Sequence, residues 1–351
     1  MARDNVQISG RGVGPGQPCF IIAEAGVNHN GDPDMAHRLI DEAAAAGADV
    51  VKFQTLNAER MVSPKAPKAT YQTETTDPGE SQFDMIRRLE ISPELHRELQ
   101  THCKEKGVVF LSSPFDEASS DLLDQLGVAA FKIPSGEISN LPFLAHVASH
   151  GKPVILSTGM SYLSEVEIAL RTMRDAGNQD CVVLHCVSNY PTNPDDVNLR
   201  AMGTMEAAFG VPVGFSDHTL GIEVAVAAVA LGAHAIEKHF TLDRKLPGPD
   251  HRASLEPNEL AEMIRSIRSV EAALGHGRKE PAASEANTAS VARKSLVAAR
   301  DIRAGARLTV EMITVLRPGT GLAPSMTPYI VGRTAKATIE AGTVLSLEML
   351  S

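Results

Sequence analysis

A repeated alternation constrains this chain more than any other feature: a short apolar or β-branched run, a polar tip, then a stretch with the spacing of an amphipathic helix. The runs that predict strands occupy residues 19–27, 48–55, 108–114, 129–136, 153–160, 181–188, 211–217 and 233–241. Helix candidates begin near Ser, Asp or Thr and end at Gly, and they occupy 32–47, 92–107, 164–177 and 219–232. Eight strand–helix units predict an α/β fold, a (β/α)8 TIM barrel. An open doubly wound sheet usually has fewer strands and a Gly-rich dinucleotide turn, and no GxGxxG or P-loop follows any run.

Composition and charge limit the partners that we expect. The 351 residues, 43% of them hydrophobic, suffice for one large domain and a small one. The first 20 residues lack the apolar core of a signal peptide, and no segment approaches the roughly 18 uninterrupted apolar residues of a membrane span, so we expect a cytoplasmic protein. The net charge of −10 disfavours nucleic acid and anionic membranes, and any anion site must be built locally. Four cysteines without CxxC or zinc-ribbon spacing are interpreted as small core residues: Cys19, Cys103, Cys181 and Cys186.

The polar tips are expected to converge, because such barrels carry their functional groups at the carboxyl ends of the strands. In chain order they are Glu24, Lys52, Gln54, Ser113, Lys132, Ser135, Glu137, Ser157, His185, Ser188, Tyr190, Ser216, Asp217, His218, Glu237 and His239. The last run is the most informative, since Glu237, Lys238 and His239 stand side by side in an apolar strand. A buried strand has no use for three ionisable groups unless a site needs their charge.

Two kinds of chemistry fit these tips. His218 and His239 suit a divalent metal with positions left for water or substrate, although a single barrel histidine is more often an ordinary hydrogen-bonding residue. Lysines with serine hydroxyls suit a phosphorylated anion, although any one serine alone is better explained as a strand end. This second set is Lys52, Lys132, Ser113, Ser135, Ser157 and Ser216. The pattern indicates a metal-assisted reaction of a phosphorylated or carboxylated small molecule, and a Schiff base on Lys132 or Lys238 stays open as an alternative.

The last part of the chain contains an internal repeat. Beyond the last barrel helix, expected at 255–275, residues 301–313 and 338–350 match in their Ile, Ala-Gly, Leu and Glu-Met positions. We therefore expect a β-rich module of two similar halves, with Gly305 and Gly342 at equivalent turns. The predicted division is a catalytic barrel at 1–275, a polar linker at 276–290 and the module at 291–351.

Ordered segments along nearly the whole chain make it resemble the sialic acid synthases. They are IAEAGVNHNG (22–31), VVKFQT (50–55), SSPFD (112–116), FKIPSGE (131–137), ILSTGM (155–160), GFSDHT (214–219), IEKHFTLDR (236–244) and GPDHRAS (248–254). The sequence around LRPGTG (316–321) resembles the small antifreeze-like SAF domain that ends these enzymes. The resemblance implies a transferase that condenses phosphoenolpyruvate with an N-acyl amino sugar to give a nonulosonic acid and phosphate.

The resemblance also implies a role for each tip. Phosphoenolpyruvate would be held by Lys52, Ser113, Lys132, Ser135, Ser157 and Ser216, with Ser188 close by where some members carry Asn. His218 and His239 would hold Mn²⁺ or Mg²⁺, which polarises the sugar aldehyde. The open-chain sugar would be positioned by Gln54, Glu137, Tyr190 and Asp250. Glu24, near the metal, or Glu137 would move protons.

Subunit arrangement and sugar are the remaining expectations. The resemblance implies a homodimer in which the C-terminal module of one subunit caps the barrel of its partner, with Arg317 reaching the N-acyl group. Composition alone favours a solvated surface arginine at that position. KIPSGE and TTDPGESQFDM (75–85) are closer to the N-acetylneuraminate and legionaminate branches than to the pseudaminate branch, which tends to replace the Gly of SGE.

The predicted enzyme is N-acetylneuraminate synthase acting on N-acetylmannosamine. The alternative is a legionaminate synthase acting on 2,4-diacetamido-2,4,6-trideoxymannose. A Schiff-base aldolase on the same barrel is the mechanistic rival. A carbohydrate- or ice-binding protein built around the tail is the non-enzymatic rival, and it would not need ionisable groups at so many tips.

Overall fold

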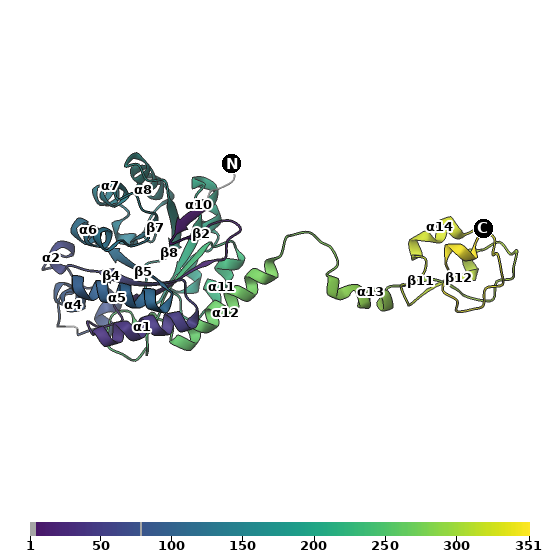
Figure 1. The fold of residues 1–351 in the computed structure, drawn as a ribbon, viewed down its shortest axis with the longest axis horizontal. Helices are drawn as coiled ribbons and strands as arrows, with labels where there is room; N and C mark the ends of the chain where they lie inside the picture. The colour runs from purple at the N-terminus through teal and green to yellow at the C-terminus, as the bar shows by residue number, and fades with distance from the viewer. Residues whose placement is uncertain (1–4, 78) are drawn as a thin grey trace. The chain divides into compact units, whose positions relative to one another are not determined.

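The computed structural model describes residues 5–77 and 79–351. Residues up to Gly275 form one compact unit and residues from His276 onward form another (Figure 1). No helix within the described residues is long and apolar enough to cross a membrane.

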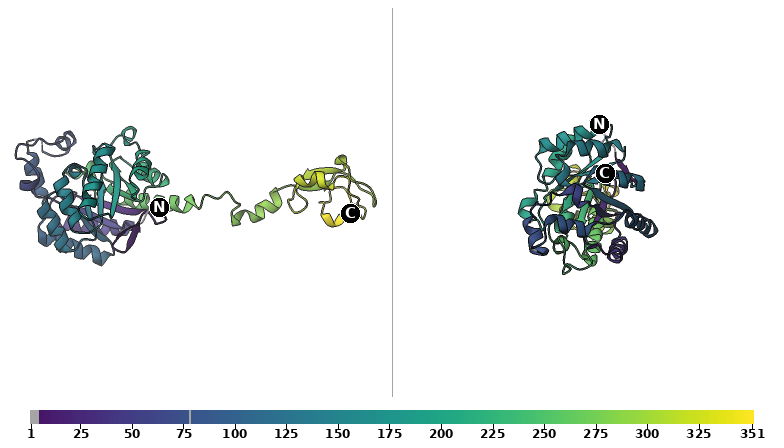
Figure 2. Two further views of the ribbon diagram at one scale, coloured as in Figure 1. Left: turned by 90° about the horizontal axis from the view of Figure 1, so that it is seen from above. Right: turned by 90° about the vertical axis from the view of Figure 1, so that its left-hand side faces the viewer.

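The first unit is built around eight parallel strands. They are β3 Phe20–Gly26, β4 Val50–Thr55, β5 Val109–Pro114, β6 Phe131–Ile133, β7 Val154–Ser157, β8 Cys181–Cys186, β9 Val213–Asp217 and β10 Ala235–His239. They pair in the order β5-β4-β3-β10-β9-β8-β7-β6, and the two end strands of this order pack against each other. The sheet therefore curls into a nearly closed barrel with helices around it (Figure 2). The predicted (β/α)8 fold is confirmed.

Capping residues set the limits of the surrounding helices as the sequence predicts. In the first of them, the Asp32 carboxylate accepts hydrogen bonds from the backbone N–H groups of Asp34 and Met35, and Gly47 ends the helix at a φ of 88°. The main helices are α1 Pro33–Ala46, α5 Pro93–Lys106, α6 Glu117–Leu126, α7 Leu141–Ser149, α8 Leu163–Asp175, α10 Ala201–Phe209, α11 Glu223–Ala230 and α12 Pro257–Leu274. Shorter pieces are α2 Ala58–Met61, α3 Thr70–Thr75, α4 Gln82–Leu89, α9 Pro194–Val197 and the 3-10 turns η1 Ser135–Glu137 and η2 His251–Ala253.

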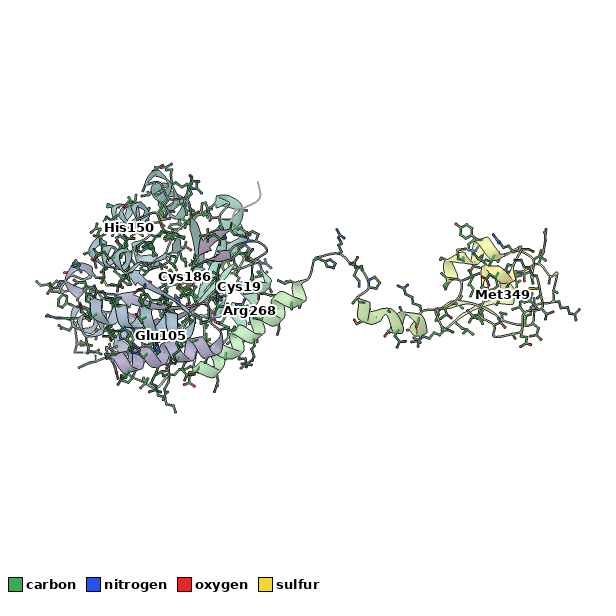
Figure 3. All side chains as sticks on the ribbon, viewed as in Figure 1. Cys19, Glu105, His150, Cys186, Arg268 and Met349 are labelled. Carbon is green, nitrogen blue, oxygen red and sulfur yellow. The ribbon has the colours of Figure 1, made fainter. Side chains whose placement is uncertain are left out.

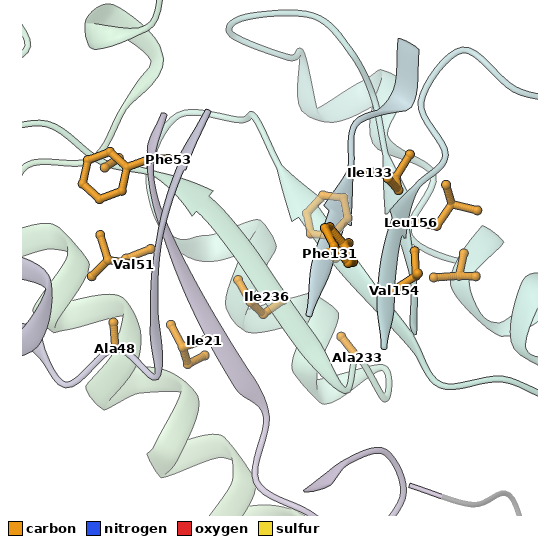
Figure 4. Close-up of a cluster of buried hydrophobic side chains, with 14 of the residues drawn as sticks. Ile21, Ala48, Val51, Phe53, Phe131, Ile133, Val154, Leu156, Ala233 and Ile236 are labelled. Carbon is orange, nitrogen blue, oxygen red and sulfur yellow. The ribbon is translucent and has the colours of Figure 1, made fainter. Parts of the chain in front are cut away.

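The barrel strands carry apolar residues on both faces. The outward side chains, such as Ile21, Val51 and Phe131, pack in a large cluster with the helices (Figure 4). The inward side chains near the strand starts form a second cluster, Phe20, Ile22, Val50, Leu111, Ala130, Ile155, Val182, Leu184 and Ala235. A hairpin that the sequence analysis did not predict, β1 Val6–Ile8 and β2 Arg11–Val13, adds its apolar side chains to this inner cluster and so covers the amino-terminal end of the barrel.

The second unit has its own core and the predicted two-fold repeat. Ile302 and Ile339 exchange two backbone hydrogen bonds of 2.8 Å, and Gly305 and Gly342 turn the chain at φ values of 78° and 85°. Its elements are α13 Ala286–Ala292, α14 Thr327–Ile330, the antiparallel pair β11 Ser295–Ala298 and β12 Ile313–Leu316, and the 3-10 turns η3 Ala283–Glu285, η4 Val310–Met312, η5 Pro324–Met326 and η6 Leu347–Met349. One expectation differs: part of the predicted linker is helical, because alanine favours helix and the Glu285 carboxylate caps the Ala282 N–H at 2.8 Å.

Candidate active site at the barrel mouth

The strand alternation builds the site directly from the sequence. Residues two apart on a strand point to the same side, so inward apolar residues are followed by inward polar ones nearer the carboxyl end. The inward apolar residue and the inward polar residue that follows it are Ile22 and Glu24 on β3, Val50 and Lys52 on β4, and Ala235 and Glu237 on β10. A polar layer therefore lies on top of the inner apolar cluster.

This polar layer lines a cavity of about 260 Å³. Thirteen of the predicted site residues line it: Glu24, Lys52, Gln54, Ser113, Lys132, Ser135, Ser157, Ser188, Tyr190, Ser216, His218, His239 and Asp250. Two do not. Glu137 is half-buried outside the cavity and accepts a hydrogen bond of 2.8 Å from the Asn140 side chain, because β6 ends at Ile133 and the strand alternation stops there. Arg317 lies exposed in the second unit.

Two buried lysines and two buried carboxylates form the floor of the cavity. Lys52 Nζ lies 2.6 Å from Glu24 Oε2 and 3.6 Å from Glu237 Oε2. Lys132 Nζ lies 3.3 Å from Glu237 Oε1, to which the Ser216 hydroxyl donates a hydrogen bond of 2.9 Å. Glu237 therefore holds both lysines, although sequence analysis gave it no role beyond its unusual place in a strand.

Burial and charge divide the two carboxylates. Burial raises the pKa of Glu24 to about 7. Burial would also raise the pKa of Glu237, but the charges of Lys132 and Lys52 outweigh it and lower that pKa to about 2. Burial also opposes the charge on Lys52, but the charges of Glu237 and Glu24 outweigh it and raise the pKa of Lys52. For Lys132 burial is the larger effect, and its pKa is lowered. Near neutral pH the floor thus combines cationic lysines with one firmly ionised carboxylate and a second that can exchange a proton.

The serine hydroxyls lie around this floor. Ser113 Oγ accepts a hydrogen bond of 2.9 Å from Lys52 Nζ, and Ser135 Oγ accepts one of 2.9 Å from the Gly159 N–H. A Cβ atom at Gly159 would lie 2.9 Å from Ser135 Oγ, so this close approach requires glycine. The buried Ser157 hydroxyl has no hydrogen-bond partner among the described residues, which leaves a donor free for a ligand.

His218 and His239, the predicted metal ligands, lie close to each other in the cavity. Their ring centroids lie 5.4 Å apart. His218 Nδ1 lies 2.7 Å from the Val187 carbonyl oxygen, which only an Nδ1–H can satisfy, so Nε2 is left as the ligand atom. Burial lowers the pKa of His239 well below its usual range, so this ring is neutral, and its buried Nδ1 has no hydrogen-bond partner within the described part of the chain. Asp250, whose pKa burial raises to about 6, lies 3.8 Å from that nitrogen. Two imidazoles beside a carboxylate fit a divalent ion such as Mn²⁺.

A different group has three ligand atoms within 4.8 Å of one another: Asp121 on α6 with His146 and His150 at the end of α7. The Asp121 carboxylate is hydrogen bonded to His146 Nε2 at 2.8 Å and lies 3.4 Å from His150 Nε2, so it already pairs with both imidazoles. This group does not line the cavity, and it is separate from the predicted pair.

Two residues that the sequence analysis singled out, Lys238 and His185, do not line the cavity. Lys238 points away from the cavity, since Nζ donates to Asp217 Oδ2 at 2.7 Å and to the Thr219 carbonyl at 2.6 Å. Only Lys132 of the two Schiff-base candidates therefore lines the site. His185 hydrogen bonds to the Val197 carbonyl at 2.6 Å instead of facing the cavity.

The four cysteines are buried and free, as predicted. Cys186, labelled inside the barrel in Figure 3, also lines the cavity, which was not expected. Its Sγ lies 3.8 Å from His218 Nδ1.

Sequence analysis missed one whole side of the cavity. The loop from 56 to 92 between β4 and α5 contains α2, α3 and α4 and contributes Met61, Tyr71, Gln72, Gln82, Met85, Ile86 and Leu89 to the lining. The Tyr71 ring lies 5.1 Å from the Tyr190 ring. The length of this loop is a usable signal, because most strand-to-helix loops in such folds have about 2–6 residues and much longer ones often form part of a site.

Comparisons with known proteins find related sequences and structures for both units of the chain. Residues 39–279 match the sequence model of the NeuB family, and residues 293–351 match that of the SAF domain. The chain is 47% identical to N,N'-diacetyllegionaminic acid synthase of Legionella pneumophila over 95% of both chains. It is 39% identical to human N-acetylneuraminate-9-phosphate synthase over 97% of this chain and 95% of that one. The crystal structure of N-acetylneuraminic acid synthetase from Leptospira borgpetersenii, solved with citrate, superimposes with a TM-score of 0.72 at 37% identity over 82% of this chain and 95% of that one.

Proposed function

Because the chain belongs to the NeuB family, we propose that it condenses phosphoenolpyruvate with 2,4-diacetamido-2,4,6-trideoxymannose to give N,N'-diacetyllegionaminic acid and phosphate. The observation that carries the reaction class is the cavity, whose lining includes Lys52 and Lys132 together with the imidazoles of the two candidate metal ligands. A protein that only bound carbohydrate, without catalysing a reaction, would have no use for two buried ammonium groups.

Each part of the floor has a task in this reaction. Lys52, Lys132 and the serine hydroxyls bind the phosphate and carboxylate of phosphoenolpyruvate and direct its methylene carbon toward the sugar aldehyde. His218 and His239 would hold a divalent ion, which supplies Lewis-acid polarisation of that aldehyde when it is bound. A carbon–carbon bond forms between the methylene and the aldehyde carbon, water adds at C2, and phosphate leaves by C–O cleavage.

Glu24 is the proposed proton-transfer group. Its pKa of about 7 allows it to accept and release a proton near neutral pH, and Gln54 donates a hydrogen bond of 3.2 Å to its Oε1. Glu137, the other candidate from sequence, lies outside the cavity, so we assign it no proton transfer.

The choice of sugar reverses the order of the two alternatives from sequence. Relatives named N,N'-diacetyllegionaminic acid synthase reach 47% and 48% identity, the second being from Campylobacter jejuni over 90% of this chain and 95% of that one. The human N-acetylneuraminate-9-phosphate synthase reaches 39%. These identities favour the diacetamido sugar over N-acetylmannosamine.

The test is phosphate release from phosphoenolpyruvate and Mn²⁺ with each sugar supplied separately. We expect the highest kcat/KM with 2,4-diacetamido-2,4,6-trideoxymannose. A higher value with N-acetylmannosamine would reverse the assignment of the sugar. Condensation of the sugar with pyruvate in place of phosphoenolpyruvate, together with an adduct trapped on Lys132 by borohydride, would replace it with aldolase chemistry.

A further inference from the structure

One side of the cavity is lined mainly by apolar side chains. This side, called the apolar wall, consists of Val27, Leu56, Met61, Met85, Ile86, Leu89 and Phe115. Most of these residues belong to a buried cluster separate from the two barrel clusters, and Met61 and Phe115 are half-buried against it. The wall is therefore a preformed apolar surface facing the site.

The chain places this wall on the open side of the strand ends. Val27, Leu56 and Phe115 directly follow β3, β4 and β5, and the other members lie in the loop beyond β4. The polar floor comes from the strands themselves. Floor and wall line the same cavity, so a substrate held at the floor can contact the wall with its other end.

The lysines that line the cavity belong to its floor, and the apolar wall carries no charged side chain. Lys52 and Lys132 are the ammonium groups among the described residues that line the cavity, and both already contact carboxylates. A phosphate group that reached the apolar wall would lose its water without gaining a cation, which is strongly unfavourable. A hydroxyl there would lose its hydrogen bonds to water, whereas a methyl group would gain burial.

One amide on the same side of the cavity is available to a substrate. Gln82 lines the cavity, and its side chain makes no hydrogen bond with another described residue. An acetamido group, with one donor and one acceptor, matches a side-chain amide that can offer both.

We propose that the apolar wall receives the end of the sugar farthest from the aldehyde and selects a terminal methyl group over a hydroxymethyl group, while excluding a terminal phosphate. The inference rests on the proposed function, because the floor and the two histidines fix the aldehyde end of the sugar. Met61 and Phe115 are the half-buried members of the wall, and they are the specificity-determining residues.

The matched probes are N-acetylmannosamine and its 6-deoxy analogue, which differ by one hydroxyl, together with N-acetylmannosamine 6-phosphate. We expect kcat/KM to be about 10- to 100-fold higher for the 6-deoxy sugar, the range in which an apolar pocket rejects an added hydroxyl. No turnover of the phosphorylated sugar is expected.

Variants of the wall test the residues themselves. Met61→Gln keeps the length of the side chain but adds an amide, so the preference for the 6-deoxy sugar should fall toward one, and Met61→Leu should retain it. Phe115→Tyr adds a hydroxyl to the wall and should favour the hydroxymethyl sugar relative to wild type. The KM for phosphoenolpyruvate and the melting temperature should change little in all three, since each replacement keeps a side chain of similar size at a half-buried position and leaves the floor lysines in place.

The outcomes separate the two proposals. Absence of phosphate release with every sugar would overturn the proposed function. Equal kcat/KM for the two uncharged sugars, turnover of the phosphorylated one, or an unchanged preference in folded Met61→Gln and Phe115→Tyr would overturn the role of the wall and leave the condensation reaction standing.

Discussion

Replacing Glu237 by Gln should destabilise the free enzyme and make phosphoenolpyruvate a stronger stabiliser. Glu237 is 4% exposed and is the carboxylate within 4 Å of Lys132, while Lys52 would keep Glu24 at 2.6 Å. Removing one partner of a buried ion pair costs about 3–5 kcal/mol, because the other charge is left uncompensated. A change of 1 kcal/mol in the free energy of unfolding shifts the melting temperature of a large domain by about 2 °C. The melting temperature of the barrel should therefore fall by roughly 6–10 °C.

The ligand should reverse much of this loss. The phosphate or carboxylate of phosphoenolpyruvate brings back a negative charge beside Lys132, so the ligand should raise the melting temperature of Glu237→Gln more than that of wild type. Thermal unfolding followed by circular dichroism over a series of ligand concentrations measures both effects. The control is Glu94→Gln, which removes a 73% exposed carboxylate. A melting temperature within about 1 °C of wild type, or equal stabilisation of both proteins by the ligand, would refute the reasoning.

The remaining predictions concern the metal pair and two buried histidines. His218→Ala should abolish turnover while the far-ultraviolet circular dichroism spectrum stays native. Wild-type enzyme treated with EDTA should lose activity and regain it with Mn²⁺. Full turnover by metal-stripped enzyme would contradict this prediction. Burial lowers the pKa of His29 and of His251 from 6.5 to about 4. Between pH 4 and 6.5 the unfolded chain therefore binds more protons than the folded chain does. The stability that these neutral histidines contribute above pH 6.5 is lost as the pH falls toward 4. Urea unfolding at pH 6.5 and at pH 4 measures how much free energy of unfolding each protein loses over this range. His29→Asn should lose less than wild type, with a difference of up to about 3 kcal/mol. Equal losses in the two proteins would exclude His29 as a contributor.

The barrel and most of its mouth could be predicted because one local rule governs both. On a strand, a period of two fixes which side chains point inward, so a polar residue two positions after an inward apolar one must lie in the cavity, as Glu24 does after Ile22. The rule fails where the strand ends. Glu137 was predicted as a site residue from its place just after the expected run 129–136 and from the family resemblance. The backbone enters a 3-10 turn at Ser135, and Glu137 does not line the cavity.

The parts that sequence analysis missed depend on contacts between distant segments. The sequence of the hairpin β1–β2 does not predict that its apolar residues pack against the inner apolar cluster of the barrel, because the strands that form this cluster come later in the chain. The same holds for Met85 and Leu89, which have ordinary helical spacing on α4 and become part of a cavity only because the loop folds over β4. Periodicity identifies the buried face of such a helix but not the surface that the face contacts.

Arg317 offers a test of whether the site is completed by a second subunit. Among the described residues that line the barrel cavity there is no arginine, while Arg317 is exposed in the C-terminal unit. It is followed by a turn held closely in place: the Gly319 N–H donates to the Ser290 carbonyl at 2.7 Å, and a Cβ there would lie 2.6 Å from Arg293 Cβ. A rigid turn presents a guanidinium at low conformational cost, which suits bidentate recognition of an N-acyl carbonyl supplied by a partner barrel.

We therefore propose a homodimer and expect Arg317→Ala to raise the KM of the sugar with little change in that of phosphoenolpyruvate. The decisive assay mixes His218→Ala with Arg317→Ala at low sugar concentration, under conditions where subunits exchange. Random exchange makes about half of the dimers mixed, and each mixed dimer of two-fold symmetry has one barrel with both its histidine and its partner's arginine, so about a quarter of wild-type activity should return. If Arg317 acted on its own barrel, the barrel with His218 would always lack the arginine. Proven exchange without recovery would therefore place the arginine in its own subunit or outside the reaction.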